Sequence, residues 1–292
     1  MRPLQITDVR ALPGDSAFLI DDGKTAILCD AGFGFTGFTI ADNVRRALGE
    51  RPLDYIFLTH SHYDHALGAP YILSRYPSAK VVAGAYAAQI FAKDSAKAKM
   101  RELDRKFAAA CGVTSYPDLA DELRVDITVE DGDAVRAGDM VFTAVALPGH
   151  TKCSVGFYLA ENKLLLGSET LGVFDGDKTI MPCYLVGYRM ALDSIAKAKA
   201  LAIDNILFPH LGLADKEKTA YFLANAAESA TATAGWIAGI LRAGGTHEDA
   251  IAAFKQKFYR GKVKETYPID AMMLNTTIMV NVIEKELILP PA

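Results

Sequence analysis

The stretch Thr59-His60-Ser61-His62-Tyr63-Asp64-His65 places three histidines and one aspartate directly after the apolar run 55–58. The apolar run predicts a short buried strand, so the polar residues are expected in the loop at its end. Two other histidines, His150 and His210, also follow short apolar runs, and only His247 is left over. Because imidazole and carboxylate groups bind zinc, iron and manganese, this pattern indicates a metal site.

The composition is that of a globular protein with a sizeable core, since 51% of the 292 residues are hydrophobic. This length allows one large domain, or one domain with an appendage. The net charge is −4 and the Lys and Arg residues are scattered. We therefore expect a small-molecule substrate and no nucleic-acid partner, which would require a basic surface.

The N-terminal residues 1–8 contain no apolar segment of the kind found in secretory signals. No apolar stretch approaches the ~20 residues that span a bilayer. The cysteines are widely spaced and lack CxxC pairing, which is typical of reduced, buried thiols. We therefore expect a cytoplasmic protein without a membrane partner. The cysteines are Cys29, Cys111, Cys153 and Cys183.

Apolar runs between turn residues predict strands, and stretches rich in Ala, Lys and Glu predict helices. We expect an α+β domain over residues 1–213, with two sheets packed face to face and helices outside, and a helical appendage over residues 214–292. The predicted strands are 16–20, 25–29, 55–58, 80–83, 125–129, 140–147, 154–159, 163–166 and 206–208, with an Asp-Gly hairpin turn between the first two. The predicted helices are 41–49, 64–75 with Asp64 as cap, 85–110, 190–201, 216–242, 246–259 with Thr246 as cap, and 269–287.

The histidine motifs together are similar to those of a known family. The motif His60-x-His62-x-Asp64-His65, the segment Pro148-Gly149-His150-Thr151 and the pair Pro209-His210 resemble the metallo-β-lactamase superfamily, in the hydrolase branch that includes glyoxalase II. The resemblance covers about residues 4–213 and not the helical tail. It implies an αββα sandwich with a dinuclear metal site at one edge, which agrees with the predicted order of elements.

The resemblance also implies a ligand set for two divalent ions, with zinc expected and iron or manganese as alternatives. A bridging carboxylate belongs in a Gly-Asp-Thr segment, where this chain has Gly167-Ser168-Glu169-Thr170. Alignment on the glycine puts Ser168 at the bridge, and alignment on the threonine puts Glu169 there. We favour Glu169 because the site requires an anionic oxygen. By the resemblance, the first ion is held by His60, His62 and His150, and the second by Asp64, His65 and His210.

Other residues are expected to act beside the metal ligands. Asp30, in Cys29-Asp30-Ala31-Gly32, resembles the family's Asp-x-Gly and would orient a ligand without binding metal. Asp64 would also accept a hydrogen bond from the attacking hydroxide, which two metal ions make available at neutral pH. Tyr184, Tyr188 and Arg189 could line a substrate pocket, or could equally begin the packing of the following helix.

These features predict a metal-dependent hydrolase of a small ester, thioester, lactone or phosphodiester. The appendage is expected to narrow access to the active site or to form a homodimer. Two alternatives stay open: an iron-dependent oxidoreductase on the same fold, and a non-catalytic metal-binding regulatory protein. His62 counts against the flavin-coupled di-iron members, which carry glutamate at that position, whereas the unusual Glu169 leaves room for the regulatory protein.

Overall fold

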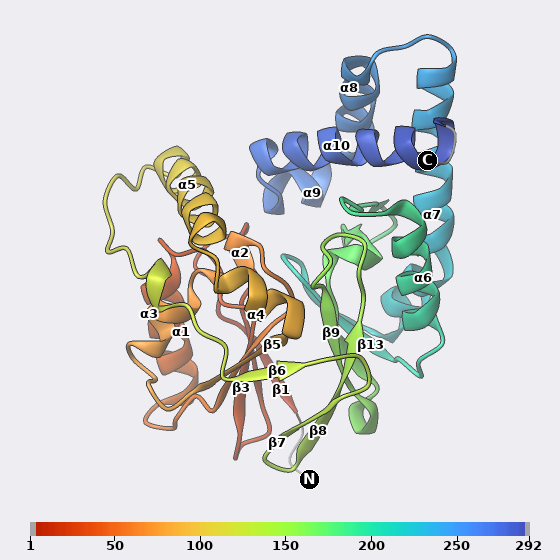
Figure 1. Cartoon of the computed structure of the whole chain (residues 1–292). Helices are drawn as coiled ribbons and strands as arrows, with labels where there is room; N and C mark the ends of the chain where they lie inside the picture. Colours follow the sequence, from red (N-terminus) through yellow and green to blue (C-terminus); the bar gives the residue numbers. More distant parts are fainter. Residues whose placement is uncertain (1–3, 290–292) are drawn as a thin grey trace. The chain divides into compact units, whose positions relative to one another are not determined.

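The computed structural model describes residues 4–289, and the chain forms two compact units (Figure 1). Unit 1 contains the chain up to Val145 together with Phe157–Leu159, and unit 2 contains Ala146–Gly156 and the chain from Ala160 onward. Among the described residues, the strands form two six-stranded sheets and one two-stranded sheet. The division into domains at residue 213 stays a prediction.

The first sheet lies in unit 1 and follows the chain order β1-β2-β3-β4-β5-β6. The predicted hairpin between β2 and β3 is confirmed, and the Asp22 carboxylate closes it by accepting hydrogen bonds from the backbone N–H of Lys24 and Thr25. Strands β3 to β6 run parallel, which places their carboxyl ends at one edge. The strands are β1 (Gln5–Asp8), β2 (Phe18–Asp21), β3 (Ala26–Cys29), β4 (Tyr55–Leu58), β5 (Lys80–Gly84) and β6 (Ile127–Val129).

The single helix predicted over residues 64–75 is wrong. The structure divides this stretch into α2 (Tyr63–Ala66) and α3 (Ala69–Leu73). A close backbone approach occurs at Gly68, where a Cβ atom would lie 1.8 Å from the carbonyl oxygen of Ala31. Only glycine allows the chain that follows β3 to pass so near. The helix is interrupted here because the Gly68 N–H donates to the carbonyl oxygen of Gly32, outside the helix, and because Pro70 has no N–H to donate.

The helix predicted over residues 85–110 is also interrupted. Lys93 adopts an extended conformation between α4 (Ala85–Phe91) and α5 (Asp94–Ala110). Helix α4 packs against β5 whereas α5 packs against α2, so the interruption lets the chain change direction between two different surfaces. The remaining helices of unit 1 are α1 (Gly37–Leu48), which begins before its predicted start, and η1 (Ala120–Glu122).

The second sheet has the order β14-β13-β10-β9-β8-β7. Within unit 1, the Phe57 ring of β4 packs against Phe142 of β8 and Phe157 of β9, with ring centroids 5.2 and 4.6 Å apart. All three rings are fully buried, and burying each contributes about 2 kcal/mol. Within unit 1, strands β8 and β9 therefore face the first sheet, as the αββα prediction requires.

The bounds of the second sheet complete the list of strands. Among the described residues, β1, β7, β11, β12 and β14 have no counterpart in the predicted strands. The second sheet contains β7 (Ala134–Ala137), β8 (Met140–Ala146), β9 (Val155–Leu159), β10 (Leu164–Leu166), β13 (Asn205–Phe208) and β14 (Gly212–Ala214), and the small sheet contains β11 (Val173–Phe174) and β12 (Ile180–Met181).

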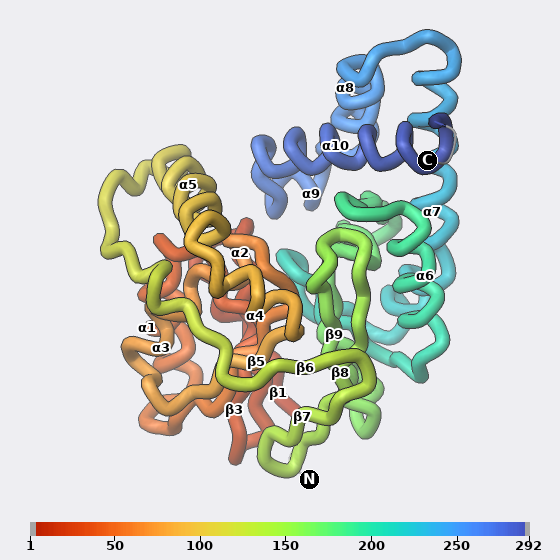
Figure 2. Tube along the Cα trace, in the orientation of Figure 1, coloured from red at the N-terminus to blue at the C-terminus, as the bar shows by residue number. Residues whose placement is uncertain are grey.

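Unit 2 ends in the predicted helical appendage, in which α8 packs against α10 (Figure 2). Thr246 is confirmed as the cap of α8: its hydroxyl accepts a hydrogen bond from Asp249 N, and the Asp249 carboxylate accepts one from Thr246 N. No helix within residues 4–289 is both long and apolar enough to cross a membrane. The helices of unit 2 are η2 (Ala160–Asn162), η3 (Glu169–Leu171), α6 (Tyr188–Lys199), α7 (Lys216–Arg242), α8 (His247–Phe258), the unpredicted α9 (Gly261–Thr266), α10 (Ile269–Ile283) and the π-helical turn η4 (Glu284–Ile288).

Candidate metal centre

The loop after β4 carries four donor side chains, His60, His62, Asp64 and His65, here termed the first donor group. His60 and His65 are fully buried, while His62 and Asp64 are partly exposed. Donor atoms of His60 lie within 4.8 Å of those of His62 and His65, and those of Asp64 lie equally close to His65. The extended residue His62 is the N-cap of α2, so the helix cap predicted at Asp64 is wrong.

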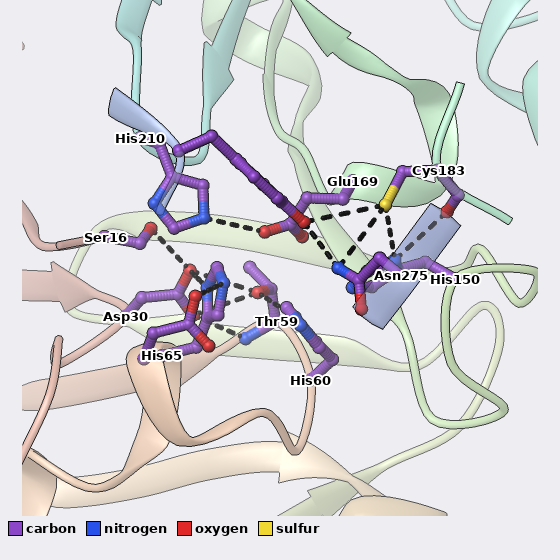
Figure 3. A network of polar contacts seen from close by, with 12 residues as sticks. Ser16, Asp30, Thr59, His60, His65, His150, Glu169, Cys183, His210 and Asn275 are labelled. Carbon is purple, nitrogen blue, oxygen red and sulfur yellow. Dashed lines mark hydrogen bonds and ion pairs between the residues drawn. The ribbon is translucent and has the colours of Figure 1, made fainter. Parts of the chain in front are cut away.

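Asp30 holds the His65 ring in place. Its carboxylate is fully buried and lies 2.8 Å from His65 Nδ1. The same carboxylate accepts hydrogen bonds from Ser16 Oγ at 2.9 Å and from Thr59 N at 2.8 Å (Figure 3). Because a carboxylate can only accept, Nδ1 of His65 carries a proton, and in the neutral ring Nε2 is then the nitrogen with the lone pair that a metal needs.

His60 is oriented through Thr59. The Thr59 hydroxyl donates to Asp30 and lies 3.1 Å from Nδ1 of His60. Since the hydroxyl proton is directed at Asp30, its oxygen accepts from Nδ1, and Nε2 of His60 is again the nitrogen with the lone pair. One buried carboxylate thus sets the orientation of two histidines in the first donor group.

Unit 2 supplies a second donor group, His150, Glu169 and His210, all of which are buried. The Nδ1 atom of His150 lies 3.0 Å from the carbonyl oxygen of Cys183, and Nε2 of His210 lies 3.0 Å from Oε1 of Glu169 (Figure 3). Ser168, the other residue considered for the bridge, is also buried, and its hydroxyl has no hydrogen-bond partner in the described part of the chain.

The chemistry of both donor groups fits divalent transition metals. His65 and His150 direct Nδ1 at oxygens that only accept hydrogen bonds, so their Nε2 atoms are suited to bind metal. Nε2 of His210 and Oε1 of Glu169 lie 3.0 Å apart, which is the distance of a direct hydrogen bond. Imidazole and carboxylate ligands without thiolate are the set expected for zinc, iron or manganese.

The predicted pocket residues lie at the start of α6. Tyr184 is fully buried with its ring 5.4 Å from that of Tyr188, which is also buried, whereas Arg189 is exposed. Burial raises the pKa of the Tyr184 hydroxyl, which therefore stays protonated at neutral pH. The role of these residues in a substrate pocket stays a prediction.

Polar residues that the sequence patterns do not identify surround the second donor group. Cys183 contacts His150 through both its carbonyl oxygen and its sulfur, and Tyr267 and Asn275 contact Cys183 in turn. The Tyr267 ring also lies against His210. The sequence Tyr267-Pro268 is the local signal that could have drawn attention to this tyrosine, since a residue before proline favours an extended backbone.

A buried carboxyl group lies near the first donor group in α5. Burial raises the pKa of Asp104 from 3.8 to about 6, and the negative charge of Asp64 adds to the effect. Hydrogen bonds from the Tyr116 hydroxyl and from Gly34 N act in the opposite direction. Asp104 thereby ties the segment after β3 to α5.

Comparison with known proteins shows which superfamily the chain belongs to. Residues 13–210 match the model of the Metallo-beta-lactamase superfamily. The chain belongs to this superfamily. A metallo-β-lactamase family protein from Thermus thermophilus has the same fold, with a TM-score of 0.63 at 17% identity over 92% of this chain and 88% of that chain.

Two relatives of this metallo-β-lactamase superfamily member are named as a hydrolase and a thioesterase. The hydroxyacylglutathione hydrolase of Cereibacter sphaeroides is 27% identical over 216 residues, which cover 70% of this chain and 65% of that protein. The atrochrysone carboxyl ACP thioesterase AgnL7 of Paecilomyces divaricatus is 26% identical over 164 residues, or 55% of this chain and 41% of that protein. The chain thus spans less than two thirds of the length of either relative.

Proposed function

We propose that this protein is a metal-dependent hydrolase with a dinuclear zinc centre that cleaves a small thioester. Membership of the metallo-β-lactamase superfamily supports the reaction class. One relative is named for hydroxyacylglutathione and the other as a thioesterase. Those names favour a thioester over the oxygen esters, lactones and phosphodiesters that the sequence motifs leave open.

The orientation of the histidines carries the proposal. Asp30 fixes His65 and the Cys183 carbonyl fixes His150, each through Nδ1. Any buried histidine needs a hydrogen-bond partner, but here the partners occupy Nδ1 and the donor atoms of His60 also lie within 4.8 Å of those of His62 and of His65, as expected of ligands oriented around a metal ion. As the resemblance of the sequence motifs implies, we assign His60, His62 and His150 to one ion and Asp64, His65 and His210 to the other, with Glu169 as the bridging carboxylate.

Divalent metal ions in such a site supply Lewis acidity that activates water and polarises the substrate oxygen at neutral pH. The protein's own contribution is to hold the ligands and to direct the attacking water. Asp64, partly exposed and with Oδ2 3.5 Å from His65 Nε2, can accept a hydrogen bond from that water and align it. The reaction requires no serine or cysteine nucleophile.

Metal analysis and one substitution test the proposal. Protein purified without chelators should contain two zinc ions per chain by elemental mass spectrometry and should hydrolyse a hydroxyacylglutathione faster than the matching oxygen ester. Asp64→Ala should lower the rate by about 100-fold or more, because it removes both a ligand and the group that aligns the water.

Asp177→Ala is the matched control, since Asp177 is an exposed carboxylate of unit 2 and its loss should leave the rate unchanged. Protein that takes up no metal even after reconstitution would overturn the proposal. So would an Asp64→Ala variant with full activity. Bound iron with oxygen consumption would replace hydrolysis by redox chemistry.

A further inference from the structure

A chain of polar contacts links the C-terminal helices to a proposed metal ligand. The Asn275 side-chain amide of α10 donates to the Tyr267 hydroxyl at 2.7 Å. That hydroxyl lies 3.7 Å from the sulfur of Cys183, and the sulfur lies 3.2 Å from Nδ1 of His150. Figure 3 shows the Cys183 sulfur joined to both the Asn275 amide and the His150 ring.

The same tyrosine also contacts the other histidine of the second donor group. The Tyr267 ring stands edge-on to His210, with centroids 5.8 Å apart and the planes at 82°. One end of Tyr267 therefore restrains the surroundings of His150, and its ring restrains His210. A single residue outside the histidine motifs thus contacts the surroundings of two proposed ligands.

Local sequence explains why Tyr267 reaches this place. Pro268 disfavours helical backbone at the residue before it, and Tyr267 has φ −117° and ψ 115°. Helix α9 accordingly ends at Thr266, and the tyrosine side chain leaves the helix and is buried, with 6% of its surface exposed. A buried tyrosine hydroxyl requires a polar partner, which Asn275 provides.

We propose that Tyr267, held by Asn275, is a positioning residue of the metal centre. Its hydroxyl steadies the Cys183 side chain, and thereby His150, while its ring steadies His210. This inference rests on the proposed function, because that proposal makes both histidines metal ligands. The two contacts use different parts of one side chain, so they can be removed separately.

Cobalt(II) titration of the full-length metal-free protein tests the inference, with the visible spectrum reporting ligand geometry. Tyr267→Phe removes the hydroxyl and keeps the ring on His210. It should weaken one of the two cobalt sites by about 10-fold and leave the other unchanged, because loss of an outer partner costs that much affinity. Tyr267→Leu removes both contacts and should weaken both sites. Asn275→Leu should also weaken cobalt binding at the site that Tyr267→Phe weakens.

Tyr221→Phe is the matched control, since the Tyr221 hydroxyl of α7 donates to the backbone carbonyl of Lys178, and its removal should leave both cobalt sites unchanged. Urea unfolding checks that each variant is folded. If wild-type protein binds two cobalt ions and folded Tyr267→Phe binds them equally well with the same spectrum, the inference is wrong and the proposed function stands. If wild-type protein binds no cobalt, both fail.

Discussion

The Asp30 carboxylate is the polar centre around which the first donor group is built. It accepts hydrogen bonds from Ser16, Thr59 and His65, and the side chain is fully enclosed. A buried donor that loses its acceptor costs about 1–3 kcal/mol. Asp30 therefore contributes to folding as well as to the orientation of His65 and, through Thr59, of His60.

Asp30→Asn should weaken both the stability of the fold and the orientation of the histidines. Asparagine tolerates the positive φ of 57° at this position, so the backbone is kept. Its NH₂ group must face at least one of the donors, which should lower the free energy of unfolding by about 2 kcal/mol and zinc affinity by about 10-fold. Urea unfolding of metal-free protein and zinc titration measure the two effects, with exposed Asp177→Asn as control. Unchanged zinc affinity would contradict the orienting role.

Asp104 makes stability depend on pH. Its pKa is about 6 in the folded protein against an ordinary value of 3.8, so between these pH values the folded protein binds the extra proton. The free energy of unfolding should therefore rise as pH falls through this window, and the gain is lost as pH rises through about 6. A shift of this size corresponds to about 3 kcal/mol.

Asp104→Asn should remove that dependence. In urea unfolding of metal-free protein, wild type should gain up to about 3 kcal/mol relative to the variant between about pH 7.5 and about pH 4. A difference between the two proteins that stays constant over this range would show that Asp104 has no raised pKa.

The sequence identifies the donor residues better than the residues around them. The motif His60-x-His62-x-Asp64-His65 is contiguous, so the local pattern is enough to place four donors in one loop. The contacts of Cys183 and Tyr267 join residues far apart in the chain and depend on how α9 and α10 pack. Contacts of this kind produce no motif with a fixed spacing, so a single sequence does not predict them.

The helices show the same difference between what the local sequence predicts and what contacts with distant residues determine. Composition predicts helical residues at 64–75 and 85–110, yet both stretches are interrupted. The first is interrupted at Gly68, whose N–H donates to the carbonyl oxygen of Gly32, and Lys93 interrupts the second where α4 and α5 turn to different partners. Both interruptions depend on contacts with other parts of the chain. Helix propensity describes only the local sequence and does not include such contacts.

The C-terminal turn η4 caps the N-terminus of α6, although the two elements are far apart in the sequence. Glu286 accepts hydrogen bonds from the backbone N–H of Tyr188 at 2.9 Å and of Arg189 at 3.0 Å, and the N-cap, Gly187, has no side chain to do so. A carboxylate at a helix N-terminus also interacts favourably with the helix dipole.

Glu286→Ala should therefore lower the free energy of unfolding by about 1 kcal/mol, the usual effect of losing a helix cap. Urea unfolding measures the change, and Glu286→Gln should retain part of the stability because it keeps one acceptor. Lys285→Ala, on the same turn, is the control. A loss of equal size in that control would mean that the turn as a whole, and not the cap, is responsible.

For the whole chain, the fold class follows from the order of the elements. Strands and helices alternate up to about residue 213 and a strand-poor tail follows, which indicates two packed sheets with helices outside and a helical appendage. The resemblance to the superfamily adds the αββα sandwich, and the structure agrees with these predictions. The substrate does not follow, because the residues that contact the donors, such as Cys183 and Tyr267, belong to no motif.

Metal binding should stabilise the folded protein as a whole. An ion that binds only the folded state adds about 2.7 kcal/mol to the free energy of unfolding at a concentration 100 times its Kd. Unfolding in urea with zinc, against chelator-treated protein, measures this gain, and Asp64→Ala should show a smaller one. If zinc stabilised wild type and this variant equally, Asp64 would not be a ligand.

The parallel ladder of β3, β4 and β5 has a consequence for the order of folding. Its pairs, Ile27 with Tyr55 and Tyr55 with Lys80, join residues separated by long segments of chain. The entropy of closing those segments must be overcome before the pairs form, so such ladders assemble slowly. The donor loop after β4 is held in place only once both neighbours of β4 have paired with it. A metal ion would therefore bind only after the sheet has formed. It would slow unfolding of the protein but would not speed its folding.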